Sequence, residues 1–315
     1  MSSVRAVSVE KLTRRFGDVP AVDAVSFEVG TGELFGLVGP DGAGKTTLLR
    51  MLAGVLKPTN GDARIFTTSI ARRPEAAKHD IAYMPQRFGL YADLTVAENL
   101  TFYADLYSVP RNERPARLER LYHFSNLGPF RDRLAGKLSG GMKQKLALSC
   151  ALIHQPKLLL LDEPTFGVDP ISRRDLWLIV HEMVEQGVTA IVSTAYMDEA
   201  ERFDRVALLH QGSVLVIDTP GRLQQSLPGT VLAIETDAPR VARDVLVDNP
   251  LARRVMIFGD AVHVTVGAAQ DAGGITRALR SAGVSVRRIA PVEASFEDVF
   301  IARLADRNGV PTSPE

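Results

Sequence analysis

The stretch that decides the fold is Gly39-Pro40-Asp41-Gly42-Ala43-Gly44-Lys45-Thr46. It fits the pattern G-x-x-x-x-G-K-S/T and joins a short apolar segment, Glu33–Gly39, to a segment of helical periodicity, Thr46–Ala53. Glycines at these spacings let backbone N–H groups surround phosphate oxygens without Cβ clashes, and the following helix points its N-terminus at the anion. The spacing therefore predicts a strand, a phosphate-binding loop and a helix in succession.

Three side chains in or beside this loop predict what it binds. Lys45 supplies a positive charge for β- and γ-phosphates, Thr46 offers a hydroxyl to Mg²⁺, and Thr47 adds a hydroxyl near the α-phosphate. We therefore expect ATP and Mg²⁺ as ligands. The expected nucleotide-binding residues of the loop are Gly39, Pro40, Asp41, Gly42, Ala43, Gly44, Lys45, Thr46 and Thr47.

Two carboxylates follow a run of four leucines. Leu158–Leu161 is typical of a buried parallel strand, and a carboxylate at the C-terminal end of such a strand reaches the nucleotide crevice. Asp162 is expected to hold Mg²⁺, directly or through a water molecule. Glu163 is expected to be the general base that orients and deprotonates the attacking water.

A third motif precedes the carboxylate strand: Leu138-Ser139-Gly140-Gly141-Met142-Lys143-Gln144-Lys145. A serine hydroxyl and two close backbone amides at a helix start can be offered to a γ-phosphate. With these motifs in this order, residues 4–220 resemble the nucleotide-binding subunits of ABC transporters. The resemblance implies an ATPase that pairs head to tail with a second ABC ATP-binding subunit, in a homodimer or a heterodimer. Each ATP then lies between one subunit's phosphate loop and Ser139, Gly140 and Gly141 of the other.

The resemblance assigns three further site residues. Phe16 is the aromatic that stacks on adenine, although a place in the apolar core is an alternative. Gln86 matches the glutamine that senses Mg²⁺ and the attacking water and links the core to a helical insertion. Asp169 belongs to the loop that crosses to the opposite site, although an ordinary turn is an alternative.

At two positions the chain departs from the family pattern. Ala195 stands where the resemblance predicts a histidine, and a methyl group cannot donate a hydrogen bond to a γ-phosphate. One hypothesis is that this chain's own site turns over slowly and that it pairs with a different subunit carrying the histidine. The alternative is slow homodimeric hydrolysis driven by Glu163. Asp41 is the second departure, since asparagine is the commoner residue of the family at this position, and we attach no mechanistic consequence to it.

Alternating strands and helices predict an α/β fold, a P-loop NTPase of ABC-cassette type with a mixed sheet core and a helical subdomain. We expect the ATP-binding domain at residues 4–220, with the helical subdomain at about 90–142. Strand and helix patterns in the order βαββαβ predict a small α+β, ferredoxin-like C-terminal domain at 228–305. A disordered tail is expected at 306–315.

The C-terminal segment, ending in Glu297-Asp298-Val299-Phe300, resembles ATP-binding subunits of the daunorubicin-resistance and multidrug-export group. That resemblance implies a separately encoded integral membrane permease as partner and export of drugs or small molecules. Residues 88–100, whose aromatics are expected to be exposed, would contact the permease. The chain would then act peripherally at the cytoplasmic face of the plasma (inner) membrane.

Composition excludes several other classes of protein. Lys+Arg and Asp+Glu both number 37 among 315 residues, so the net charge of zero argues against a broad nucleic-acid footprint, and no nucleic-acid partner is expected. Cys150 is the one cysteine and is expected in the core. Neither a signal peptide nor a membrane-spanning run is apparent, so a soluble intracellular chain is expected. A soluble ABC ATPase acting on ribosomes or DNA is the main alternative; a P-loop kinase or GTPase would have no use for the Ser139 motif.

Overall fold

The computed structural model describes residues 5–307. Within this range the chain forms two compact units, which we call the N-terminal unit, ending at Ile217, and the C-terminal unit, beginning at Asp218. Among the described residues, no helix has both the length and the apolar composition needed to cross a bilayer.

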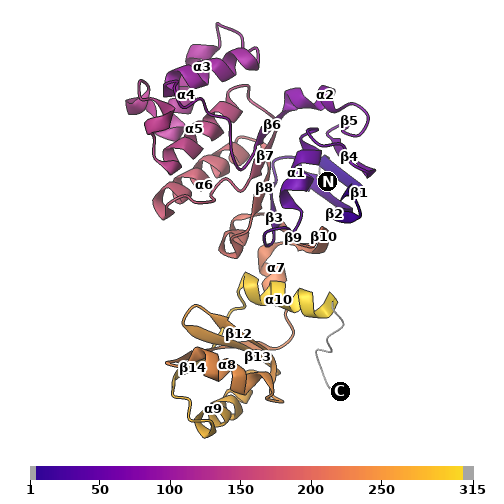
Figure 1. Ribbon diagram of the computed structural model, residues 1–315, viewed down its shortest axis with the longest axis vertical. Helices are drawn as coiled ribbons and strands as arrows, with labels where there is room; N and C mark the ends of the chain where they lie inside the picture. Colours follow the sequence, from indigo (N-terminus) through magenta and orange to yellow (C-terminus); the bar gives the residue numbers. More distant parts are fainter. Residues whose placement is uncertain (1–4, 308–315) are drawn as a thin grey trace. The chain divides into compact units, whose positions relative to one another are not determined.

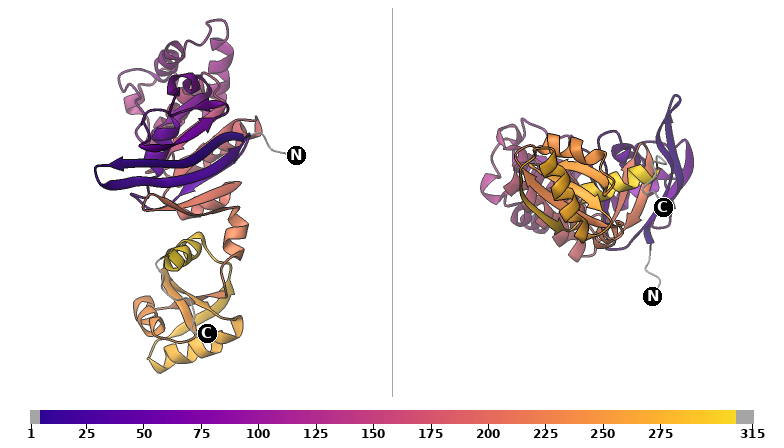
Figure 2. Two further views of the ribbon diagram at one scale, coloured as in Figure 1. Left: turned by 90° about the vertical axis from the view of Figure 1, so that its right-hand side faces the viewer. Right: turned by 90° about the horizontal axis from the view of Figure 1, so that it is seen from below.

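The N-terminal unit begins with an antiparallel sheet in the order β2-β1-β4-β5. Its strands are β1 (Arg5–Phe16), β2 (Val19–Gly30), β4 (Asn60–Ile65) and β5 (Thr68–Ser69). The long β1–β2 hairpin, indigo in Figure 2, reverses at the turn expected from the sequence, where Gly17 has a positive φ of 59°. Buried and exposed residues alternate along β2, so one face of this sheet contributes to a core.

A second sheet of six strands, in the order β10-β9-β3-β8-β7-β6, forms the centre of this unit (Figure 1). Its strands are β3 (Leu34–Val38), β6 (Ile81–Met84), β7 (Leu158–Asp162), β8 (Thr189–Thr194), β9 (Arg205–His210) and β10 (Ser213–Asp218). The pairs β3–β8, β3–β9, β6–β7 and β7–β8 are parallel, so the C-terminal ends of these strands share one edge. This edge carries the functional side chains.

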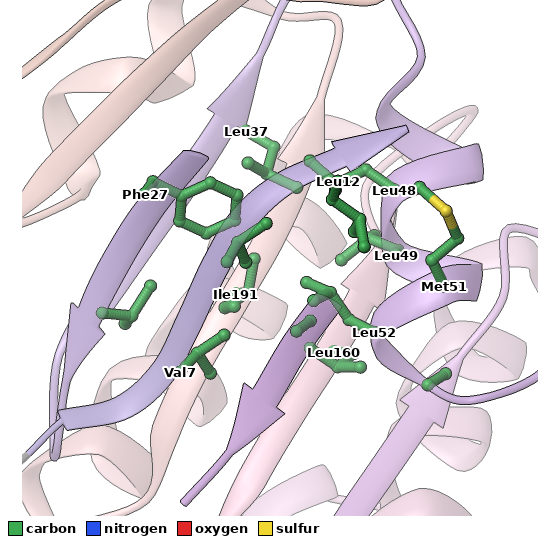
Figure 3. Close-up of a cluster of buried hydrophobic side chains, with 14 of the residues drawn as sticks. Val7, Leu12, Phe27, Leu37, Leu48, Leu49, Met51, Leu52, Leu160 and Ile191 are labelled. Carbon is green, nitrogen blue, oxygen red and sulfur yellow. The ribbon is translucent and has the colours of Figure 1, made fainter. Parts of the chain in front are cut away.

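Helix α1 (Lys45–Leu52) packs between the two sheets. Figure 3 shows its Leu48, Leu49 and Leu52 beside Val7 of β1 and Leu160 of β7. All five side chains are fully buried. Because burying an aliphatic side chain contributes about 1.5–3 kcal/mol, this cluster fixes the helix that follows the phosphate loop.

Helices occupy the stretch between β6 and β7. They are α3 (Val96–Leu106), α4 (Arg114–Ser125) and α5 (Gly140–Leu152), with α6 (Pro170–Glu185) after β7. Thr95 and Glu98 form a reciprocal cap at the start of α3. Cys150 of α5 is buried as expected, and burial raises the pKa of its thiol.

The C-terminal unit contains a four-stranded antiparallel sheet in the order β12-β13-β11-β14. Its elements are α7 (Pro220–Gln225), β11 (Thr230–Thr236), α8 (Pro239–Val247), β12 (Ala252–Phe258), β13 (Ala261–Val266), α9 (Ala272–Ser281), β14 (Val286–Val292) and α10 (Phe296–Arg307). From β11 to β14 they follow the order expected from the sequence. Leu246 of α8 and Leu279 of α9 pack with Ile234 and Val264 in a separate core.

Five elements escape sequence analysis. Strands β4, β5 and β6 and the short helices α2 (Pro74–Ala77) and α7 have too few residues, or too little periodicity, to give a pattern. The segment near Pro220 therefore forms a helix rather than a plain linker. Helix α10 extends through Arg307, so the tail expected from residue 306 does not begin there, and residues 308–315 lie outside the described range.

A buried polar pair anchors α10 to the C-terminal sheet. Nδ1 of His263, on β13, lies 3.0 Å from Oδ2 of Asp298. The backbone N–H and hydroxyl of Ser295 donate to the same Oδ2, at 2.9 and 2.8 Å. Burial alone would raise the pKa of Asp298, but the hydrogen bonds from His263 and Ser295 outweigh it and lower that pKa.

Replacing Asp298 with Asn should destabilise the C-terminal unit at neutral pH by about 1–3 kcal/mol, because buried donors lose a charged acceptor. An Asp with a folded-state pKa below its unfolded value of about 3.9 contributes stability above that pH and loses it as pH falls through the folded pKa. The difference between wild type and variant in urea unfolding should therefore be smaller at about pH 3, below the unfolded-state pKa, than at pH 7. An equal difference at both values would contradict this assignment.

Candidate functional site

The loop between β3 and α1 has a backbone conformation that requires glycine at several positions. Gly42 and Gly44 have positive φ values of 77° and 100°. A Cβ on Gly39 would lie 2.3 Å from the carbonyl oxygen of Leu209, and one on Gly44 would lie 2.4 Å from that of Ala21. Packing against the neighbouring backbone therefore fixes the loop in a curled form.

A pocket of about 310 Å³ opens beside this loop. Its lining residues are Ala21, Asp41, Gly42, Ala43, Gly44, Lys45, Thr46, Thr47, Gln86 and Glu163. Backbone N–H groups at the start of α1 and one lysine give it the character of an anion site. The pocket and its donors fit the phosphates of a nucleotide.

Lys45 and Glu163 form a buried ion pair at the floor of the pocket. The Lys45 Nζ lies 3.1 Å from Glu163 Oε1, and the two side chains are only 4% and 8% exposed. Lys45 also donates to the carbonyl oxygens of Gly39, at 2.7 Å, and Pro40, at 3.1 Å. The cation and the carboxylate that the sequence assigns to phosphate contact and to general-base chemistry are therefore held together.

Asp162 lies at the C-terminal end of β7 and joins three elements. The Thr46 hydroxyl donates to its Oδ1 at 2.9 Å and the Ser193 hydroxyl at 2.8 Å. The Tyr83 hydroxyl lies 3.5 Å from Oδ2, and burial, followed by the charge of Asp162, raises the pKa of Tyr83. A hydroxyl and a carboxylate side by side next to a phosphate pocket match the oxygen ligands that Mg²⁺ prefers.

Glu163 has a strained backbone. Its φ is +49°, which is uncommon for a residue with a Cβ. Its N–H donates to the Ser193 hydroxyl at 3.0 Å, and the Gln86 amide donates to its Oε2 at 2.9 Å. Gln86 therefore lines the pocket beside Glu163, and its role toward Mg²⁺ and the attacking water stays a prediction. These contacts aim the carboxylate into the pocket.

Other expected site residues lie outside this pocket. Ser139 and Gly140 are exposed at the start of α5, and Asp169 is exposed at the N-cap of α6. Gly141 makes a close approach between the two helices, since a Cβ there would lie 2.1 Å from the Ser172 hydroxyl. The backbone N–H of Ser172 lowers the pKa of Asp169. We call the three exposed residues Ser139, Gly140 and Asp169 the outward-facing edge.

Phe16, at the end of β1, is 51% exposed, so the alternative of a core position is wrong. The Arg14 guanidinium lies over its ring at 4.7 Å. An exposed aromatic ring held by a cation is available for stacking, and the adenine role of Phe16 stays a prediction.

Ala195 lies just beyond the end of β8, partly buried. The N–H of Tyr196 donates to the Thr194 hydroxyl at 3.0 Å, so the backbone turns directly after the strand. No side-chain donor is present at residue 195.

Sequence reasoning misses Ser193, Tyr83 and Ala21. The Ser193 hydroxyl contacts the Asp162 carboxylate and the backbone N–H of Glu163. The Tyr83 hydroxyl faces Asp162, and Ala21 lines the pocket. Ser193 could have been found, because β8 is the parallel neighbour of β7 and a hydroxyl at its C-terminal end falls at the same edge. The other two gave no signal.

Comparison with known proteins extends these observations. A family model described as ABC transporter matches residues 22–166. The chain is 43% identical to the probable multidrug ABC transporter ATP-binding protein YbhF of Escherichia coli (strain K12), over 94% of this chain and 51% of that protein, so it spans about half of YbhF. It is 35% identical to the Nod factor export ATP-binding protein I of Paraburkholderia xenovorans (strain LB400), over 96% and 97% of the two chains. Identity to the daunorubicin/doxorubicin resistance ATP-binding protein DrrA of Streptomyces peucetius is 33%, over 95% and 92%.

Solved structures show the same fold. An ATP-binding subunit of an ABC transporter superposes with a TM-score of 0.64 at 30% identity, over 70% of this chain and 92% of that one. The ATP-binding cassette MJ0796, a dimer in a post-hydrolysis state with ADP and Pi, gives 0.62 at 25% identity, over 68% and 98%. The predicted ABC-cassette fold is confirmed.

Replacing Lys45 with Ala should weaken binding of a fluorescent ATP analogue by about ten- to a hundredfold, because a charge-assisted contact contributes about 1.5–3 kcal/mol. Titration followed by fluorescence anisotropy measures the loss. The exposed Lys57, changed to Ala, is the matched control and should bind as wild type does. Unchanged affinity in Lys45→Ala would show that the phosphates bind elsewhere.

Proposed function

Because the chain belongs to the ATP-binding subunits of ABC transporters, we propose that it binds and hydrolyses ATP and thereby powers a separate membrane permease. The observation that carries the proposal is the Lys45–Glu163 pair beside the glycine-rich loop. In this pair a cation and the proposed general base lie in contact, and both line the pocket beside the loop. In this proposal the N-terminal unit is the ATP-binding domain of the chain.

The first step is exchange of partners at Lys45. The β- and γ-phosphates and the Glu163 carboxylate are all anions, and the buried Lys45 ammonium group already contacts Glu163. Incoming phosphates therefore compete with Glu163 for this ammonium group. Glu163 then keeps the Gln86 amide and becomes free to accept a proton from water. Thr46 and Asp162 would hold Mg²⁺, which neutralises phosphate charge when bound.

A second ATP-binding subunit completes the site in this proposal. Ser139 and Asp169 are exposed, and neither lines the pocket of its own chain. Phe166 and Ile171, on either side of Asp169, are 53% and 76% exposed, which favours a covered surface in an assembly. The dimeric cassette MJ0796 gives further support to pairing.

Even when a second subunit completes the site, we propose that ATP turnover at this chain's own site is slow. Ala195 provides no donor for the γ-phosphate or the general base, and the loss of one such contact costs about 10²–10³ in rate. The chain would then serve as the slower member of a pair with a different subunit. Slow hydrolysis by a homodimer remains the competing form of the proposal.

The relatives support export as the direction of transport, since they are described as a multidrug, a Nod factor export and a daunorubicin/doxorubicin resistance ATP-binding protein. The partner is proposed to be an integral membrane permease, with the chain bound peripherally at the cytoplasmic face. Residues 88–100 are the proposed contact. Among the aromatic side chains of this segment, Tyr91 is 47% exposed. Phe88 is half-buried, with its ring centroid 5.1 Å from that of Tyr103. The expectation that both aromatics are exposed is therefore wrong for Phe88. The C-terminal unit is proposed to be an accessory domain.

Glu163→Gln should trap an ATP-bound dimer, because the side chain keeps its shape and cannot accept the proton of water. Size-exclusion chromatography with ATP and Mg²⁺ measures the dimer. Adding Ser139→Arg to the same variant is the control and should abolish the trap, since that bulky side chain blocks the outward-facing edge. A monomer that persists in Glu163→Gln with ATP would count against the mechanism.

Replacing Ala195 with His should raise the ATPase rate by about tenfold or more, because it restores a donor near the γ-phosphate. The rate per ATP-binding site is measured by phosphate release. Ala195→Leu, which adds bulk without a donor, should give no increase. An unchanged rate in Ala195→His would sink the slow-site hypothesis.

A further inference from the structure

Glu199 is a buried carboxylate outside the nucleotide pocket, with 1% of its surface exposed. It lies in a short 3₁₀ segment, Met197–Arg202, that follows β8. Both of its oxygens are occupied. Oε2 accepts from the hydroxyls of Thr194, at 2.6 Å, and Thr165, at 3.2 Å, while Oε1 accepts from the Trp177 indole at 3.0 Å.

These donors come from three segments that border the site. Thr165 lies two residues after Glu163, Thr194 ends β8 next to Ala195, and Trp177 belongs to the helix that begins after Asp169. Glu163, Ala195 and Asp169, which the proposed reaction and the outward-facing edge involve, therefore lie next to these donors in the chain. The Glu199 carboxylate therefore connects the segment that follows Glu163 to helix α6, which begins after Asp169.

The charge of Glu199 is balanced locally by Arg173. Its Nε lies 3.9 Å from Glu199 Oε1, and its guanidinium covers the Tyr196 ring at 4.3 Å. A buried carboxylate without partners would be strongly unfavourable. Satisfied by three donors and one cation, it instead rigidifies the groups around it.

We propose that Glu199 is a positioning residue that holds residues 163–169 in one conformation. The strained φ of +49° at Glu163 needs contacts on both sides of the residue to persist. Ser193 supplies one contact, at the Glu163 N–H, and Glu199 supplies the other through Thr165. Through Trp177, the same carboxylate fixes α6, so the general base and Asp169 keep a constant relation within the chain. The kinetic part of this inference rests on the proposed ATPase function.

Thr165→Val tests the proposal with little change of shape, because valine fills the same space without a hydroxyl. It should lower kcat for ATP hydrolysis about tenfold and leave KM within about twofold, since misplacing a catalytic group affects the transition state more than binding. Thr165→Ser keeps the donor and should restore kcat. Glu199→Gln, which puts an N–H against one of the donors, should act as Thr165→Val does.

The matched control is Thr236→Val in the C-terminal unit. Thr236 is also buried, and its hydroxyl accepts from the Ala238 N–H, far along the chain from the site. This variant should lower stability without changing kcat per ATP-binding site. If Thr165→Val lowers only the melting temperature, as Thr236→Val does, Glu199 has a merely structural role and the proposal is overturned.

Hydrogen exchange supplies a readout that does not need turnover. Amides of residues 163–171 should exchange about tenfold faster in Thr165→Val than in wild type, and not in Thr236→Val. Equal exchange in both variants would overturn the positioning role even if the wild-type chain hydrolyses ATP. Absence of hydrolysis in the wild-type chain, with faster exchange in Thr165→Val, would instead refute the proposed ATPase function alone.

Discussion

The buried ion pair between Lys45 and Glu163 is the constraint on which the rest of the site depends. Its two charges lie 3.1 Å apart with almost no exposed surface, so removing either leaves the other uncompensated in a medium of low dielectric. The glycine-rich loop, the Gln86 amide and the strained backbone at residue 163 all act to keep this pair in one place. In the proposed function, a phosphate replaces Glu163 as the partner of Lys45, and nucleotide binding would thereby release the proposed general base.

The parallel sheet explains how residues so far apart in sequence meet. Strands β3, β7 and β8 are neighbours, and their C-terminal ends present the loop before Lys45, the carboxylates of Asp162 and Glu163, and the Ser193 hydroxyl at one edge. Helix α1 is fixed by burial between two sheets, which holds Thr46 against Asp162. The exposed residues Ser139 and Asp169 lie at the starts of two other helices, and the proposed function has them complete the site of a second subunit.

The sequence predicts those parts of the molecule whose signal is local. The glycine spacing before Lys45 and the four leucines before Asp162 each depend on a few adjacent residues, and both lie where expected. Strand β6 is missed because four residues in a parallel sheet carry no periodicity. Glu199 is missed for another reason: its donors lie 34 and 22 residues before it in the chain, at Thr165 and Trp177, so its role exists only in the folded state.

The central claim is that nucleotide phosphates replace Glu163 as the partner of Lys45. A crystal structure of the chain with a non-hydrolysable ATP analogue and Mg²⁺ tests it most directly. The account predicts Lys45 Nζ within hydrogen-bonding distance of the β- and γ-phosphates, with Glu163 separated from it and still contacting Gln86. An analogue bound in the pocket while Lys45 and Glu163 stay paired as they are now would contradict it.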